Sequence, residues 1–164
     1  MRYVRLFPIL AAIACSAPKE APPLPPSKVV EWAAIAGAPT PGPDNTVRVA
    51  LELQATIDPG WHVYSLGQST GGPAPMSVKV SPPYSIDGEI VGPAPVKAKD
   101  PNFGIETETY SGEQIFKIPL KLAASASLSP PPIELKVRSQ SCSDRLCLPA
   151  RTTTLTVQPE KGTT

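Results

Sequence analysis

The stretch SCSDRLCLP, residues 141–149, holds two cysteines with four residues between them. Before it, IELKVR (residues 133–138) alternates apolar and polar side chains, which is the period-2 pattern of a half-buried strand. After it, RTTTLTV (residues 151–157) is rich in β-branched residues and also predicts a strand. Two strands joined by a short polar loop form most simply an antiparallel hairpin, with Cys142 and Cys147 facing each other at its base.

This hairpin allows a disulfide between Cys142 and Cys147. Directly opposed residues in an antiparallel pair have Cα atoms about 4.5–5.5 Å apart, and a disulfide needs about 4.4–6.8 Å. Closing so short a loop stabilises the fold by only about 2 kcal/mol. Alternation puts Leu135, Val137 and Ser139 on the inward face, so Cys142 falls on the outward face if no bulge intervenes, where a partner could reach its thiol. Exported proteins also carry inert disulfides, so spacing alone leaves a structural and a reactive bond open.

Similar strand patterns recur along the chain. The predicted strands besides the hairpin are residues 29–32, 47–57, 61–65, 76–80, 84–86, 89–91 and 108–122. Pro119 lies inside the last of these and is expected at a sheet edge or a bulge, and residues 92–104 are expected to be irregular. The 23 prolines and 11 glycines disfavour long helices. These features predict an all-β domain over residues 29–158, an immunoglobulin-like β-sandwich of about seven to nine short strands.

The N-terminal segment predicts export. Residues 1–14 combine Arg2 and Arg5 with a short apolar run, as in a signal peptide. The sequence AIAC that ends at Cys15 resembles a bacterial lipobox, in which Cys15 would be lipidated. An ordinary cleaved signal and an uncleaved short anchor remain alternatives. Residues 15–28 are rich in proline and predict an extended tether, and residues 159–164 predict a disordered tail.

Composition excludes several classes of function. The formal net charge of +1 gives no electrostatic attraction to nucleic acid or to anionic membranes. His62 is the only histidine, and one histidine with scattered carboxylates makes no metal site. Trp61 and Tyr64 are expected to be core or sheet-surface residues. Asp144 and Arg145 are solvated turn residues or modulators of a nearby thiolate. The cysteine pair is the only predicted site with chemistry.

The chain resembles the N-terminal periplasmic domain family of the thiol:disulfide interchange protein DsbD. The most specific likeness is CSDRLCLP, residues 142–149, followed by a threonine-rich strand. Three further features agree: PGWHVYS (residues 59–65), the loop of residues 100–104, and Tyr110 leading into an Ile/Leu/Pro strand. The resemblance covers about residues 29–158, the whole predicted domain.

The resemblance implies an immunoglobulin-like domain whose cysteine pair, here Cys142 and Cys147, is redox-active. Such domains take reducing equivalents from a membrane-embedded partner and pass them to periplasmic oxidoreductases of the isomerase or thioredoxin-like type. A cap loop with an aromatic residue shields the disulfide in that family. In this chain the loop contains Asp100, Phe103 and Gly104, and Phe103 is the candidate cap aromatic.

We therefore expect a periplasmic domain, lipid-anchored or otherwise secreted, that relays electrons by thiol–disulfide exchange. The electron donor would be a membrane protein acting in trans, because no segment after the leader approaches the length of a membrane helix. No cofactor is needed, since a dithiol carries two electrons itself. The competing hypothesis is a non-catalytic exported sandwich used for partner binding or structure, with an inert disulfide.

Overall fold

The computed structural model describes residues 28–68, 71–122 and 130–160, and these form an all-β structure with one short 3-10 helix at Pro43–Asn45. The strands are β1 (Val30–Ala36), β2 (Thr40–Pro41), β3 (Val47–Ile57), β4 (His62–Tyr64), β5 (Ser77–Val80), β6 (Tyr84–Ile86), β7 (Val96–Lys99), β8 (Glu106–Tyr110), β9 (Glu113–Leu122), β10 (Ile133–Ser139), β11 (Ser141–Cys142) and β12 (Arg151–Val157). Within these ranges no helix is long and apolar enough to cross a membrane. The predicted all-β class is confirmed.

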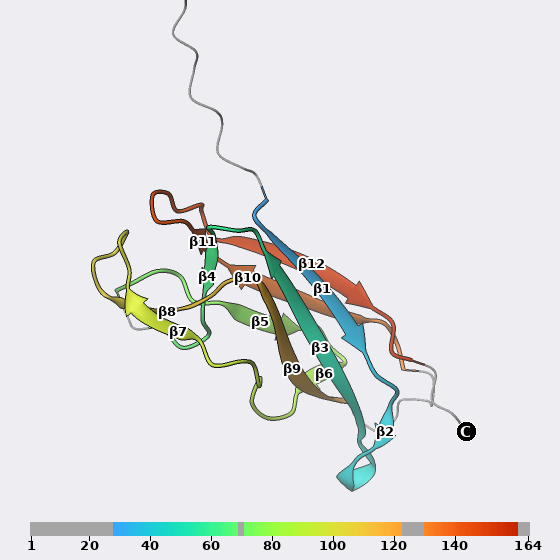
Figure 1. Cartoon of the computed structure of the whole chain (residues 1–164). Helices are drawn as coiled ribbons and strands as arrows, with labels where there is room; N and C mark the ends of the chain where they lie inside the picture. Colours follow the sequence, from blue (N-terminus) through green and yellow to red (C-terminus); the bar gives the residue numbers. More distant parts are fainter. Residues whose placement is uncertain (1–27, 69–70, 123–129, 161–164) are drawn as a thin grey trace, which may run out of the picture.

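The strands form three antiparallel sheets (Figure 1). The first has the order β1-β3-β9-β6, with β2 paired to β3; the second is β12-β10-β5; the third is β11-β4-β8-β7. The first two sheets share one hydrophobic core, whose buried members include Leu51, Leu53, Phe116, Ile118, Leu120, Ile133, Leu135 and Val137. Two sheets that pack their apolar faces together make a sandwich, as the sequence predicts.

Strict alternation gave the right strand limits. β3, β6 and β12 have the predicted bounds, and every second residue of β3 from Val49 to Ile57 is buried. In β10 the side chains of Ile133, Leu135, Val137 and Ser139 are buried, which confirms the predicted inward face. When one face of a strand is buried, the alternation of apolar residues fixes its register, because a slip by one residue would expose them.

Three predicted limits are wrong. β1 continues to Ala36 because seven of its residues pair with β3, which outweighs the weak strand propensity of alanine. Residues 108–122 belong to two strands, β8 and β9, separated by a turn in which Gly112 has a φ of 67°. Residues 89–91 contribute a single bridge, from Val91 to Lys117.

The irregular segment predicted at residues 92–104 contains β7 (Val96–Lys99). All four residues of β7 are exposed, since it lies at the edge of the third sheet and pairs only with β8. Without a buried face, a strand shows no alternation that a sequence pattern could reveal.

Pro119 lies in β9, an interior strand and not the edge strand expected. Its carbonyl accepts a hydrogen bond from the N–H of Asp87, so its missing N–H falls on the β6 side. The paired part of β6 ends at Ile86. The proline therefore lies where its neighbouring strand stops, and only the last bond of this ladder, the one an N–H at position 119 would return to Asp87, is missing.

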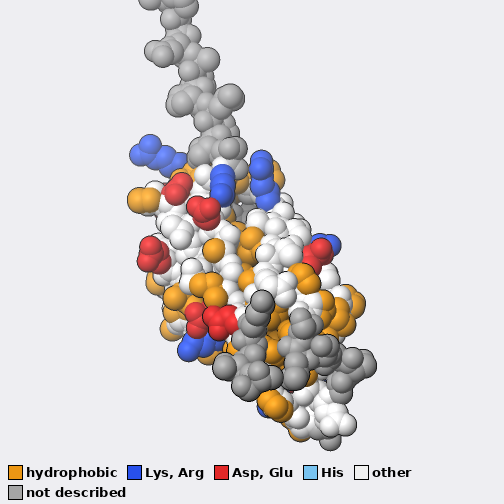
Figure 2. All heavy atoms as spheres, turned by 90° about the vertical axis from the view of Figure 1, so that its right-hand side faces the viewer, with side chains coloured by type: hydrophobic (Ala, Val, Ile, Leu, Met, Phe, Trp, Pro, Cys, Tyr) orange, Lys and Arg blue, Asp and Glu red, His pale blue; other side chains and the backbone are white. Residues whose placement is uncertain are grey.

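The predicted signal peptide, the lipidation site Cys15 and the tether up to residue 27 lie outside the described residues, as do residues 161–164 of the tail. Figure 2 shows acidic and basic side chains interspersed over one face of the described domain, in keeping with the net charge of +1. No large field of one sign develops on that face.

Candidate functional site

The cysteine hairpin forms as predicted, with β10 and β12 antiparallel and Ser139 opposite Arg151. Cys142 and Cys147 are directly opposed and joined by a disulfide, with their Cα atoms 4.1 Å apart. The N–H of Ser143 donates to the carbonyl of Leu146 at 2.8 Å, which closes the turn between them. The loop is therefore a local unit that holds the two sulfurs together.

Strand β11 places Cys142 in a second pairing. After Ser139 the chain leaves the sheet of β10, and Ser141 and Cys142 pair with Val63 and His62 of β4. Cys142 consequently lies between His62 on one side and Cys147 on the other. Directly opposed residues in antiparallel pairs point to the same face, so these three side chains share a face.

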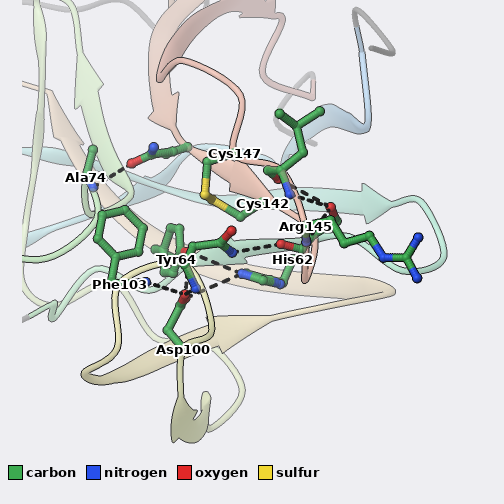
Figure 3. The surroundings of a disulfide bond; sticks show 12 residues. His62, Tyr64, Ala74, Asp100, Phe103, Cys142, Arg145 and Cys147 are labelled. Carbon is green, nitrogen blue, oxygen red and sulfur yellow. Dashed lines mark hydrogen bonds and ion pairs between the residues drawn. A yellow bond between two sulfur atoms is a disulfide. The ribbon is translucent and has the colours of Figure 1, made fainter. Parts of the chain in front are cut away.

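The expectation that Cys142 has an accessible thiol is wrong. Cys142 is fully buried, whereas Cys147 is half-buried. The face that carries Cys142 also carries His62 and Tyr64, and the loop of Asp100 and Phe103 lies beside it (Figure 3). Cys147 is thus the more accessible sulfur of the pair.

This loop, from Asp100 to Gly104, is the predicted cap loop, and Asp100 anchors it. The Asp100 carboxylate is buried and accepts hydrogen bonds from the Tyr64 hydroxyl at 2.7 Å and from the backbone N–H groups of Asn102 and Phe103 at 2.7 and 3.2 Å. The N–H of Gly104 donates to the Asp100 carbonyl at 2.8 Å. With a φ of 72°, Gly104 has a backbone conformation that favours glycine.

Two contacts join the cap loop to the rest of the site. The Asn102 side-chain amide donates to the carbonyl of Ser143, inside the cysteine loop, at 2.8 Å. Phe103 packs edge-on against Tyr64, with the ring centroids 6.0 Å apart, and keeps 36% of its surface exposed. Figure 3 shows Phe103 and Tyr64 beside the disulfide. The role of Phe103 as a shield stays a prediction.

Burial and hydrogen bonds together set the protonation of three polar groups in the site: Asp100, Tyr64 and His62. Burial alone would raise the pKa of Asp100, but the hydrogen bonds from Tyr64, Asn102 and Phe103 outweigh it and lower that pKa. Burial and the bond to Asp100 raise the pKa of Tyr64. Burial also lowers the pKa of His62 below its ordinary 6.5, although Asp100 and Asp144 act in the opposite direction. The site therefore combines an ionised carboxylate, a neutral phenol and a neutral imidazole near pH 7.

His62 is the site residue that the sequence reasoning missed. It was considered only as a metal ligand, and within the described ranges no group of three metal-binding side chains occurs. Tyr64 was expected in the core or on a sheet surface and is buried. The one available signal was the spacing of His62 and Tyr64, which puts both on one face of a strand. Asp144 and Arg145 are exposed in the cysteine loop, as expected of turn residues.

The pKa of His62 can be measured without ambiguity, because the chain has one histidine. In the oxidised folded protein we expect proton NMR of the imidazole to give a pKa below 6.5, and in the urea-unfolded chain a pKa of about 6.5. The unfolded imidazole binds its proton at higher pH, so acidification through this range favours unfolding. A folded pKa at or above the unfolded one would contradict the burial argument.

Comparison with known proteins agrees with this geometry. The family model for the N-terminal domain of the thiol:disulfide interchange protein DsbD matches residues 30–159, which span β1 to β12 and include both cysteines and the cap loop. No curated protein and no solved structure matches the chain. Domains of this family are periplasmic, and membership implies a role in thiol–disulfide exchange. The chain belongs to the family of DsbD N-terminal domains.

Proposed function

We propose that this protein relays reducing equivalents in the periplasm by thiol–disulfide exchange at Cys142 and Cys147. A membrane-embedded donor acting in trans would reduce the pair, and thioredoxin-like or isomerase-type oxidoreductases would reoxidise it. The observation that carries the proposal is a disulfide across a short loop, with one cysteine buried and the other half-buried, in a domain of this family. A dithiol carries the two electrons, so the exchange requires no cofactor.

The difference in burial supports an order in which the two sulfurs react. A thiolate of the donor attacks Cys147, because Cys142 is fully buried, and Cys142 leaves as a thiolate that takes up a proton. The donor's second thiolate then attacks the donor's first sulfur in the mixed disulfide, and Cys147 leaves as a thiolate. In the second half-reaction the acceptor oxidises the pair. The Cys147 thiolate attacks the acceptor's disulfide, and Cys142 resolves the mixed disulfide by attacking Cys147.

The cap loop would regulate this access. Asp100 fixes the loop by its hydrogen bonds, and Asn102 connects the loop to Ser143. Docking of a partner would displace Phe103 from Tyr64. Leu146, 41% exposed beside Cys147, offers an apolar contact to that partner.

A lipid anchor on Cys15 would hold the domain near a membrane donor and raise its effective concentration there. This part of the proposal rests on the sequence of residues 12–15 alone. Intact mass spectrometry of the membrane fraction would check it, and a mature chain that begins at another residue would contradict it.

Trapping tests the relay. Cys142→Ser keeps the accessible sulfur but removes the resolving one, so we expect it to accumulate a mixed disulfide with its partner in the native compartment. Non-reducing gels would detect the adduct, and mass spectrometry should identify a thiol oxidoreductase joined to Cys147.

Two control variants complete the experiment. Cys147→Ser keeps only the buried sulfur of the pair and should capture little. The double variant Cys142→Ser/Cys147→Ser retains only Cys15 and should capture nothing. If no variant captures an oxidoreductase, the relay is wrong and the disulfide is inert.

The cap can be tested on the isolated protein. In the oxidised state, Phe103→Ala should react several-fold faster with a small dithiol, because the sulfurs become more open to attack. Ile105→Ala, which removes a comparably exposed side chain near the same loop, is the matched control and should react like the wild type. An unchanged rate for Phe103→Ala would remove this residue from the site.

A further inference from the structure

Cys142 must lose a proton before it can resolve a mixed disulfide, because the thiolate is the attacking species. Its burial makes this loss unfavourable, since a charged thiolate is poorly solvated away from water. Water has little access to a side chain that is fully buried. A base on the protein is therefore needed next to Cys142.

The groups that face this position come from three elements. His62 and Tyr64 belong to β4, Asp100 lies at the start of the cap loop after β7, and Asp144 belongs to the cysteine loop. The Asp100 carboxylate accepts bonds from Tyr64, Asn102 and Phe103 and a longer one, 3.4 Å, from Thr107. Tyr64 is a neutral phenol, and Asp144 is exposed to solvent. His62 is the remaining residue, and it is paired directly with Cys142 between β4 and β11.

The hydrogen bonds assign the imidazole tautomer. The Tyr64 hydroxyl donates its proton to Asp100 at 2.7 Å. The contact of His62 Nε2 with the Tyr64 oxygen, 3.3 Å, must then be a donation from Nε2–H (Figure 3). A neutral imidazole carries one N–H, so Nδ1 is left unprotonated as the proton acceptor. Once Nδ1 is protonated, the Asp100 oxygen 3.8 Å from Nε2 stabilises the cation.

We propose that His62 is the base that takes the proton of the Cys142 thiol when Cys142 resolves a mixed disulfide on Cys147. The proton moves from Cys142 Sγ to His62 Nδ1, and the Cys142 thiolate attacks Cys147 Sγ. The bond between Cys142 and Cys147 forms, and the bond between Cys147 and the partner sulfur breaks. The partner leaves as a thiolate with the electron pair, and the imidazolium returns its proton to that thiolate or to water. This inference rests on the proposed function and deepens it.

Reaction of the reduced protein with an aromatic disulfide that releases a coloured thiolate separates the two steps. Attack by Cys147 releases the first thiolate at a rate proportional to reagent concentration. Resolution by Cys142 releases the second at a rate independent of that concentration. Cys142→Ser should give the first release alone, which identifies the phases.

The pH profile of the second phase decides the proposal. With His62 as base, the wild-type rate should be nearly constant from about pH 6.5 to 8, because the imidazole is already neutral there. His62→Gln keeps a polar side chain without a base. Its second phase should be slower by about tenfold or more at neutral pH and should rise about tenfold per pH unit, following the thiolate fraction of Cys142. Its first phase should match the wild type.

Two results would overturn the role of His62: a wild-type second phase that rises about tenfold per pH unit, or a flat profile in both proteins. If His62→Gln does not fold, a wild-type second phase that rises about tenfold per pH unit still overturns the role of His62. Because the reagent is a small molecule, a result against His62 would not bear on the relay between proteins, which the trapping experiment tests separately. Absence of any second release from the wild type would instead contradict the resolving role of Cys142, and with it the proposed function.

Discussion

The site depends on the pairing of two residues of β11 with β4. This pairing takes the chain from the sandwich sheet of β10 onto the third sheet, within two residues of Ser139. It gives the two cysteines of one short loop different environments: Cys142 is enclosed between His62 and Cys147, and Cys147 remains half-exposed. A simple hairpin extended from β10 and β12 would give no such asymmetry. The proposed exchange, in which Cys147 meets the partner and Cys142 resolves, rests on this asymmetry.

The buried carboxylate of Asp100 is the second constraint. A buried charge is stable only when hydrogen bonds replace its water, and here most of them come from the cap loop itself and from Tyr64. The same carboxylate therefore folds the loop, orients Tyr64 and provides a negative charge near His62. With His62 in its proposed role, Asp100 would couple the position of the loop to proton transfer at Cys142. Partner docking that moves the loop would also change the surroundings of the imidazole.

The sequence was informative where one face of a strand is buried. The alternation in residues 47–57 and the flanks of the cysteine loop predicted β3, β10 and β12 closely. The alternation pattern did not predict β7, which is exposed on both faces. It also predicted one strand in place of β8 and β9, because the turn at Gly112 interrupts the alternation only briefly.

The proximity of His62 to Cys142 could not be predicted. Residues 80 positions apart are brought together by a two-residue pairing, and such a short pairing leaves no periodic signal. The cysteine pair follows from its spacing and the cap loop from the resemblance to the family, whereas the burial of Cys142 accompanies its pairing with β4 in the third sheet.

The central claim is that the Cys142–Cys147 bond is exchanged and not inert. Its reduction potential tests this most directly, measured by equilibrating the purified domain with defined ratios of reduced and oxidised dithiol and quantifying both forms. The account predicts a value more oxidising than about −300 mV, in the range of exchange-active disulfides. A potential below about −300 mV would place the bond among structural disulfides and contradict the account.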